Sequence, residues 1–250
     1  MSIEQNRLKI TLSQQVVDHD PFKNLALVEE RVLSAEPGEW IVFPEAVLSG
    51  YSPEDPDYIS RLDPIALRDS VRHIAELTSA KACICLFGSA MPYDDGWQNA
   101  ALVAAGGEIV GRQGKRKLSQ LDQKHFVPAA EPAVHNITDV PFAIQLCREL
   151  LFPATWFALR QQGAKIVFHL NNAIKPKDAI WRHLLISRAV ENGCFVCSVN
   201  NAAEPQELGS FLIGPDGEVI VEIEPRRSEA VSAEIDLGRV SFDMAKRFDF

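Results

Sequence analysis

Cys147 is a thiol placed where a predicted strand gives way to a predicted helix. The apolar run Phe142–Leu146 indicates a strand, and apolar residues at helical spacing begin at Ala154. Polar Arg148 and Glu149 follow the cysteine at once, so burial ends abruptly there. A thiol that enters a helix from a strand end meets the positive end of the helix dipole, which stabilises a thiolate. Cys147 is therefore a candidate nucleophile, although most free cysteines are simply small buried hydrophobes.

Glu45 is a second reactive side chain at a predicted strand end. It closes the buried run "EWIVFPE" and opens the loop "EAVLSGYSPED". Taken by itself, such a residue is more simply a helix cap or a solvated loop acid. Together with a thiol it has a chemical use, because a carboxylate can take the thiol proton during attack on a carbonyl carbon.

The other four cysteines give no comparable signal. Cys83, Cys85, Cys194 and Cys197 lie inside apolar runs, where a free thiol behaves as a small hydrophobe. The Cys194–Cys197 spacing would suit zinc, but both residues lie in a strand-like run and no turn brings them together. We therefore expect no metal site, and the odd number of thiols indicates a reducing, cytoplasmic environment.

Predicted strands and helices alternate along most of the chain, and they place both reactive residues at strand ends. The predicted helices span residues 21–35, 64–80, 154–163 and 179–193. The predicted strands span residues 7–14, 39–45, 82–90, 99–105, 107–112, 142–146, 164–170 and 194–200, followed by three strands within 209–237 that include a hairpin at Pro215–Gly217. The segment 113–141 shows no periodicity, and a loop of that length usually serves a site. With no repeat or linker, we expect a single domain over residues 1–250.

Composition excludes several classes of protein. The chain has 46% hydrophobic and 24% charged residues, which is ordinary for a globular protein. Its formal charge of -9 disfavours a nucleic-acid surface, since phosphate binding requires clustered cations. No apolar run is long enough to span a bilayer, so we expect no membrane partner.

Further motifs follow one another in a specific order along nearly the whole chain. Gln14 in a strand and Asn24 in a helix precede "FPEAVLSGY", and "CRELLFP", "LRQQGAK", "WRHLLISRAVENGCFVCSVNN" and "GSFLIGPDGEV" follow. In this order they resemble the motifs of the nitrilase (carbon–nitrogen hydrolase) superfamily, in its amidase-like branch. The resemblance implies an α+β fold, a four-layer α-β-β-α sandwich with two mixed sheets flanked by helices. It also implies a homodimer or higher homo-oligomer and a catalytic Glu–Lys–Cys set that includes Glu45 and Cys147.

The lysine of that set has two possible positions in "GRQGKRKLSQL". Counting from "GEIVG" without a gap gives Lys115, with Lys117 in the place of the family's histidine. Matching the family's frequent Arg–Lys pair gives Lys117 instead, with Ser119 in the histidine place. We favour Lys115. Asp122 is the nearest candidate for a second acid that often follows in the family, although it is one methylene shorter than glutamate.

The resemblance implies hydrolysis of a non-peptide C–N bond in a small amide or carbamoyl compound. Glu45 would activate the Cys147 thiol, a thioester would form with release of ammonia or an amine, and water would hydrolyse it. The lysine ammonium and the backbone N–H of Arg148 would hold the oxyanion, and no cofactor would be needed. The expected pocket loops are 49–57, 118–127 and 171–177, and the candidate substrate-binding residues are Asp122, Arg148, Asn171 and Asn172.

Three alternatives remain open from the sequence. Nitrile hydrolysis would use the same Glu–Lys–Cys set, although the nucleophile motif lacks the tryptophan that follows the cysteine in nitrilases. A Cys–His–Asn arrangement would use His169 and Asn171, which lie on the strand after Cys147. A catalytically silent scaffold would use the sandwich only to bind a partner.

Overall fold

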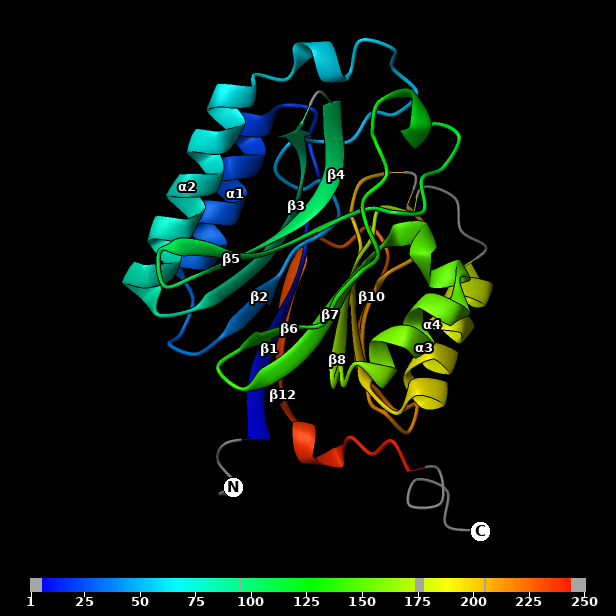
Figure 1. Ribbon diagram of the computed structural model, residues 1–250. Helices are drawn as coiled ribbons and strands as arrows, with labels where there is room; N and C mark the ends of the chain where they lie inside the picture. The colour runs from blue at the N-terminus through cyan, green and yellow to red at the C-terminus, as the bar shows by residue number, and fades with distance from the viewer. Residues whose placement is uncertain (1–5, 95, 174–177, 205, 244–250) are drawn as a thin grey trace.

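The structure is a computed structural model that describes residues 6–94, 96–173, 178–204 and 206–243. Two six-stranded mixed sheets stack face to face, and two helices cover the outer face of each sheet (Figure 1). The four-layer sandwich predicted from the sequence is therefore confirmed.

Both sheets have a parallel centre and antiparallel flanks. The first sheet has the order β12 (Glu229–Asp236), β1 (Arg7–Gln14), β2 (Trp40–Val42), β3 (Ile84–Tyr93), β4 (Gly96–Ala105) and β5 (Glu108–Gly114). The second sheet has the order β11 (Val219–Ile223), β10 (Ser210–Ile213), β9 (Phe195–Val199), β8 (Ile166–Leu170), β7 (Val140–Leu146) and β6 (His135–Ile137). Strands β1, β2 and β3 are parallel, as are β7, β8 and β9.

One helix lies between each pair of consecutive parallel strands, as parallel pairing requires. These helices are α1 (Pro21–Leu33), α2 (Pro64–Lys81), α3 (Pro153–Gln161) and α4 (Asp178–Asn192). Proline stands at the start of the first three, where its missing N–H has no helical partner to lose. The side chains of Asp20 and Asp63 cap α1 and α2 by accepting N–H groups of the first turn. No helix in the described part of the chain combines the length and apolar character needed to cross a membrane.

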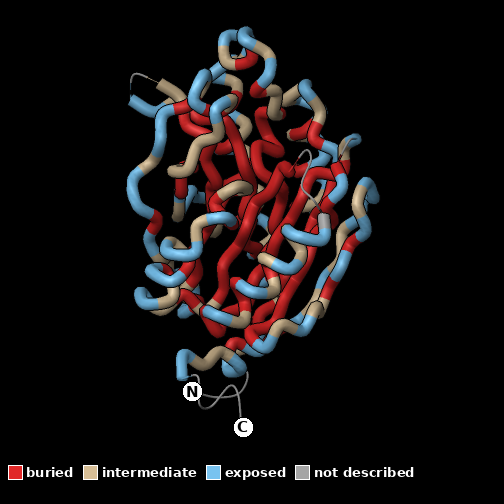
Figure 2. Tube along the Cα trace, turned by 90° about the vertical axis from the view of Figure 1, so that its right-hand side faces the viewer, coloured by how far each residue is buried: buried red, intermediate tan, exposed pale blue. Residues whose placement is uncertain are grey.

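Apolar side chains fill three layers between the elements. The central layer lies between the two sheets, where the Trp40 ring stacks on Phe168 at 5.6 Å and meets the edge of Phe142 at 5.3 Å. The outer layers lie under α1 and α2 on one side and under α3 and α4 on the other. In Figure 2 the buried strands form the middle of the molecule, while exposed segments lie around them.

The segment 113–141 is more ordered than the sequence predicted. It contains the short strand β6, which pairs with β7 as a hairpin, and the 3-10 helix η3 (Asp122–Lys124). Strands β3 and β4 are also longer than predicted and pair over ten residues each. The apolar runs in the sequence missed the paired ends of β3 and β4, which become half-buried or exposed, and they missed β6, which has no buried residue.

The fold brings several strand ends to one edge of the sandwich. Strand β5 runs in the same direction as β2, because each neighbouring pair from β3 to β5 is antiparallel. The carboxyl ends of β2, β5, β7 and β8 carry the residues singled out from the sequence. Ligand sites in sheets with parallel strands usually lie outside such ends.

Candidate active site

Glu45, Lys115 and Cys147 come from three strand ends and from both sheets. Glu45 follows β2, Lys115 follows β5, and Cys147 follows β7. Charge interactions connect all three side chains, so the structure brings them together. No cluster of three or more His, Cys, Asp or Glu side chains that could hold a metal ion occurs among the described residues.

Glu45 is fully buried and held by two donors on one oxygen. Its Oε1 accepts hydrogen bonds from Lys115 Nζ and from Asn99 Nδ2, each at 2.8 Å. Its Oε2 is buried and has no hydrogen-bond partner within the described part of the chain. A buried carboxylate oxygen of this kind is costly unless a proton or ligand group reaches it. One oxygen of Glu45 is thus fixed, and the other is available for chemistry.

The backbone around Glu45 is tightly constrained. The next residue, Ala46, has a φ of 54°, a left-handed conformation that is unfavourable for a residue with a side chain. Strand β3 packs directly against this turn at Gly88, where an added Cβ would lie 2.2 Å from the Ala46 nitrogen. Gly88 is therefore needed for the close approach of the two segments, and this packing fixes the position of the carboxylate.

Lys115 lies between two carboxylates. Its Nζ is 2.8 Å from Glu45 Oε1 and 3.0 Å from Asp122 Oδ2, and the residue is only 2% exposed. Lys117, in contrast, is half-buried, and its Nζ lies 5.1 Å from the ring centroid of Phe152. The structure therefore places Lys115, and not Lys117, beside Glu45.

Asp122 interacts with the protein through both oxygens. Besides Lys115, its Oδ2 accepts the Ser119 N–H at 3.0 Å, and its Oδ1 accepts the Tyr51 hydroxyl at 2.6 Å. Its carboxylate is fully buried. These contacts position Lys115, and among the described residues they occupy the acid with protein groups.

The charges in this cluster shift one another's pKa in opposite directions. Burial raises the pKa of Glu45, and Lys115 only partly opposes this. Burial alone would lower the pKa of Lys115, but the charges of Glu45, Cys147 and Asp122 raise it above its ordinary value. For Asp122 burial is outweighed by Lys115 and by the hydrogen bonds from Tyr51 and Ser119, so its pKa is lowered. Lys115 is accordingly a stable cation between two acids of unequal strength.

Cys147 begins a five-residue 3-10 helix, η4 (Cys147–Leu151), with a φ of 44°. Burial and the charge of Glu45 raise the pKa of Cys147 to about 12, although Lys115 and the N–H of Asn172 oppose the shift. The expectation that a helix terminus would stabilise a thiolate here is therefore wrong. The helix that follows is short, and desolvation beside a carboxylate outweighs its field. A reaction at this thiol would need a base, and Glu45 is the carboxylate whose charge acts most strongly on it.

The Cys–His–Asn alternative is not supported by the geometry. His169 Nε2 donates to the backbone carbonyl of Cys147 at 2.8 Å, and its Nδ1 accepts from the Ser198 hydroxyl at 2.8 Å. Burial lowers the pKa of His169 to about 4, so the ring is neutral. Nε2 thus holds the strained Cys147 backbone and Nδ1 is occupied by Ser198, so both ring nitrogens are hydrogen-bonded to groups other than the thiol.

Glu149 joins the turn that begins at Cys147 to the loop that carries Lys115 and Lys117. Its Oε2 accepts the Leu146 N–H at 2.8 Å, and its Oε1 accepts the N–H groups of Arg116 at 2.9 Å and Lys117 at 3.2 Å. Burial raises the pKa of Glu149 despite these three donors. One buried carboxylate thus fixes the Cys147 turn relative to the loop that carries Lys115.

Asn171 and Asn172 follow β8 and lie against the same cluster. The carbonyl of Asn171 accepts the Glu45 N–H at 3.3 Å, and the Asn172 N–H donates toward the Cys147 thiol. The Asn172 side chain is used internally, since its Oδ1 accepts from Asn201 and Gln206. The Asn171 side chain is fully buried, yet neither its Nδ2 nor its Oδ1 has a hydrogen-bond partner among the residues that the structure describes. Residues 174–177 of the predicted loop 171–177 lie outside the described residues.

Three residues that support the site were missed in the sequence. Asn99 lies within an apolar strand, Tyr51 within the loop after Glu45, and Glu149 directly beyond the nucleophile. A polar residue inside the run "NAALVAA" was the one available signal, because a buried polar group requires a partner. The arrangement as a whole provides a thiol, an adjacent base and a buried cation, which is what acyl transfer through a covalent intermediate requires.

Comparison with known proteins agrees with this geometry. The family model described as carbon-nitrogen hydrolase matches residues 10–243. The omega-amidase YafV of Yersinia enterocolitica is 25% identical over 92% of this chain and 90% of its own length. The 2-oxoglutaramate amidase of Bacillus subtilis is 27% identical over 79% of this chain and 78% of its own length.

Solved structures show the same fold. An amidase from Nesterenkonia sp. superposes with a TM-score of 0.80 at 20% identity, covering 96% of this chain and 94% of its own. Nit3 of Saccharomyces cerevisiae, a member of branch 10 of the nitrilase superfamily, gives a TM-score of 0.81 at 20% identity, covering 94% and 92%.

Proposed function

We propose that this chain, which belongs to the carbon–nitrogen hydrolase family, hydrolyses small amides through a thioester on Cys147. One observation carries the proposal: Lys115 is held 2.8 Å from Glu45 at the strand edge where Cys147 begins its strained turn. A silent scaffold would gain nothing from an ion pair buried beside a thiol, because desolvating charges costs stability.

In the first half of the reaction, Glu45 takes the thiol proton as Cys147 attacks the amide carbonyl. The unpartnered Oε2 of Glu45 is the oxygen free to receive that proton. The raised pKa of Cys147 means that the thiolate forms only as attack proceeds, with Glu45 as the base. Negative charge then builds on the substrate oxygen, where the Lys115 ammonium and the Arg148 N–H would stabilise it.

Collapse of the tetrahedral intermediate releases the amine. Glu45, now protonated, donates its proton to the leaving nitrogen, and a thioester remains on Cys147. The same carboxylate then takes a proton from water, and the resulting attack frees the acid and the thiol. The raised pKa of Glu45 suits both roles, because burial lets this carboxyl group hold a proton more readily than an ordinary glutamate before returning it.

A related protein gives independent support for the covalent step. In a glutamate-to-glutamine mutant of the amidase from Nesterenkonia sp. AN1, the acetamide moiety of fluoroacetamide is added covalently to the active-site cysteine. Because this chain shares that fold, we assign the corresponding nucleophile role to Cys147.

We further propose that the substrate is an omega-amide, the amide of an acid that carries a second, carboxylate end. This class is contained in the names of the relatives from Y. enterocolitica and B. subtilis.

Asn171 is assigned to the polar part of the substrate next to the reacting carbonyl. Its buried carboxamide has two donors and one acceptor without partners, and a bound amide would satisfy them.

The test is a screen for ammonia release from small amides, carbamoyl compounds and nitriles, with Cys147→Ala as the control. The proposal predicts turnover of amides by the wild type and none by the variant. Equal ammonia release by both proteins would remove Cys147 from the reaction, and turnover of nitriles alone would replace the substrate class.

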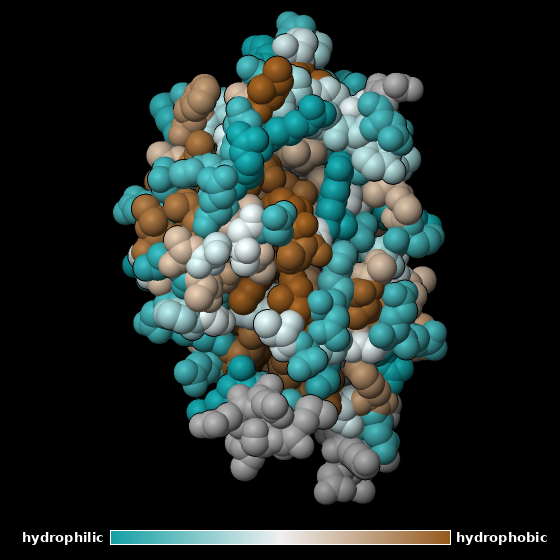
Figure 3. Space-filling view, turned by 60° about the vertical axis from the view of Figure 1, so that its left-hand side comes forward, coloured by the Kyte–Doolittle hydropathy of each residue, from teal (hydrophilic) through white to brown (hydrophobic). Residues whose placement is uncertain are grey.

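A cytoplasmic homo-oligomer belongs to the same proposal. All five cysteines are free thiols, which suits a reducing compartment. Large apolar side chains are exposed on and beside α3 and α4, namely Leu151, Phe157 and Ile180. On another face, Figure 3 shows apolar side chains gathered in a band with hydrophilic side chains on either side. Contiguous exposed apolar surface is typical of interfaces.

A further inference from the structure

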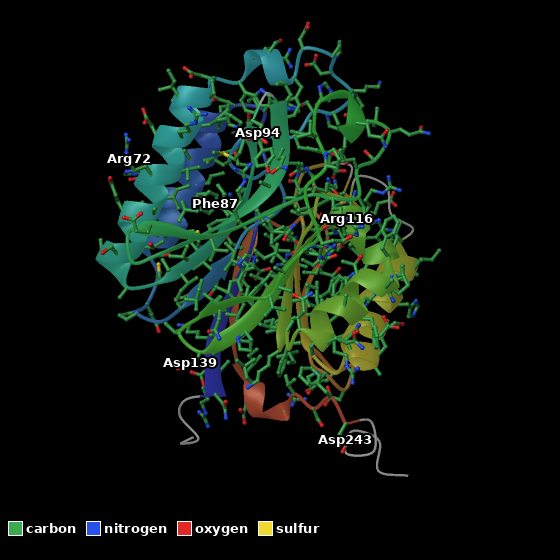
Figure 4. All side chains as sticks on the ribbon, viewed as in Figure 1. Arg72, Phe87, Asp94, Arg116, Asp139 and Asp243 are labelled. Carbon is green, nitrogen blue, oxygen red and sulfur yellow. The ribbon has the colours of Figure 1, made fainter. Side chains whose placement is uncertain are left out.

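A pocket of about 540 Å³ lies between the loop that carries Lys115 and Lys117 and the segment that follows Cys147. Arg116, on its rim, is labelled in Figure 4 and lies on the side of the molecule that carries α3 and α4. We call this cavity the Lys117–Arg148 pocket, and it is lined by Arg116, Lys117, Leu118, Gln123, Phe126, Val127, Pro128, Arg148 and Phe152.

Two cations in this pocket have no anionic partner. Lys117 Nζ and Arg148 Cζ lie 5.1 Å and 5.9 Å from the centroid of the same ring, that of Phe152. Within the described ranges, neither side chain has a carboxylate within 4.0 Å, whereas Arg116 pairs with Glu131. Two positive charges that line one pocket without a carboxylate partner attract an anion, because its charge would offset both.

One of these cations is held in place. Arg148 Nη1 donates to the Leu118 carbonyl at 2.8 Å, which fixes one edge of the guanidinium and leaves its other N–H groups for a ligand. The backbone N–H of Lys117 is fixed by Glu149. The pocket is therefore partly preorganised for a planar anion such as a carboxylate.

The remaining wall is largely apolar. Leu118, Phe126, Val127 and Pro128 line the pocket together with the Phe152 ring. A small molecule with methylene groups and one charged end fits this lining, and the volume lies within the range of roughly 300–1,000 Å³ that is usual for small-ligand sites.

The pocket is linked to the reacting groups through the chain. Arg148 directly follows Cys147, so their Cα atoms are about 3.8 Å apart. Lys117 is two residues beyond Lys115: the Lys115 side chain enters the cluster with Glu45, and the Lys117 side chain lies over the Phe152 ring. Glu149 holds the two segments together through the Leu146 and Lys117 N–H groups. The pocket and the thiol therefore lie on two chain segments that one buried carboxylate joins.

We propose that the Lys117–Arg148 pocket is the subsite for the carboxylate end of the substrate. The inference rests on the proposed amide hydrolysis and identifies which residues select an acidic amide over a neutral one. Lys117, considered from the sequence as a catalytic lysine, is a specificity residue in this assignment.

The test compares two amides of equal chain length, glutaramate with a carboxylate end and pentanamide with a methyl end. The measured quantity is the ratio of their kcat/KM values in Lys117→Met and Arg148→Met, each of which keeps the backbone N–H. Loss of one charge-assisted hydrogen bond lowers the ratio by about tenfold or more. Lys124→Met is the matched control, because Lys124 is exposed on the same loop and does not line the pocket. A ratio that stays at the wild-type value in both pocket variants overturns the proposal.

Binding of glutarate provides a second readout that does not depend on turnover. Isothermal titration should show weaker binding to Lys117→Met by about tenfold or more and no change in Lys124→Met. This arm answers the question even if wild-type protein hydrolyses neither amide, a result that would refute the proposed function alone. Glutarate must also inhibit pentanamide hydrolysis competitively. Non-competitive inhibition would show an anion site separate from the substrate and would overturn the assignment.

Discussion

Replacing Lys115 by methionine tests the central ion cluster most directly. Lys115 Nζ lies 2.8 Å from Glu45 and 3.0 Å from Asp122, inside the protein. At an effective dielectric constant of about 20, each contact corresponds to a Coulomb energy on the order of 6 kcal/mol. Methionine has a similar length and no charge, so Lys115→Met removes both attractions while filling most of the space.

The variant should lose turnover for two reasons. Without the cation, nothing with a full positive charge opposes the burial that already raises the pKa of Glu45, so this pKa should rise further and less of the acid is ionised to accept the thiol proton. The oxyanion also loses a donor, which typically costs about 3 kcal/mol of barrier, or roughly a hundredfold in rate. We therefore expect kcat to fall by at least about a hundredfold.

The assay is ammonia release from a neutral amide, corrected for the folded fraction measured by urea denaturation. The pH dependence of unfolding should also become stronger in Lys115→Met. A carboxyl group with a raised folded-state pKa stabilises the fold at low pH, and this stability is lost as the pH rises through that pKa. Lys124→Met, an exposed loop lysine, is the control for both measurements. The reasoning is refuted if Lys115→Met keeps more than about a tenth of wild-type kcat, since no single oxyanion donor is worth so little.

Four further predictions concern the groups around this cluster. Cys147→Ala should show no ammonia release with an unchanged far-UV circular dichroism spectrum, and residual turnover near wild type would contradict its role. Glu45→Gln should slow both half-reactions, so intact-protein mass spectrometry after mixing with substrate should show an acyl adduct, whereas unchanged rates would make Glu45 a structural acid. In the wild type, kcat should decline on the acid side at a pH above 4.5, because burial raises the Glu45 pKa from that value and the base must be ionised. Gly88→Ala should lower the free energy of unfolding by about 1–3 kcal/mol in urea titration, because the added Cβ would meet the Ala46 backbone. Unchanged stability together with unchanged kcat would show that the turn can move.

The positions of Glu45 and Cys147 were predictable because both residues end apolar strands. The point where an apolar run ends and polar residues begin can be read directly from the sequence. Parallel strands bring their carboxyl ends to one edge of a sheet. The choice between Lys115 and Lys117 could not be made from such a pattern. Both lie on one short loop, and only the depth of each side chain separates them, which depends on the packing of distant segments. The gap-free placement selected the lysine that the structure puts beside Glu45.

The residues that support the site could not be predicted from the sequence for the same physical reason. Asn99 contacts Glu45 from a strand that is distant in sequence, and Glu149 receives N–H groups from a loop more than thirty residues earlier. Such partners are set by tertiary packing and have no local periodicity. The pKa of Cys147 was mispredicted because the local field of a helix end is visible in sequence, whereas the desolvation of the thiol is not.

The active centre also crosses the boundary between the two sheets. Glu45 and Lys115 belong to the sheet of β2 and β5, Cys147 belongs to the sheet of β7, and the Glu45 N–H donates to Asn171 beyond β8. Neither half of the sandwich holds a complete set of reacting groups. Enzymatic activity should therefore report the assembly of the two sheets. Two fragments separated near residue 131, of which the second also carries β12 of the first sheet, should each be inert and should regain turnover only on reassembly.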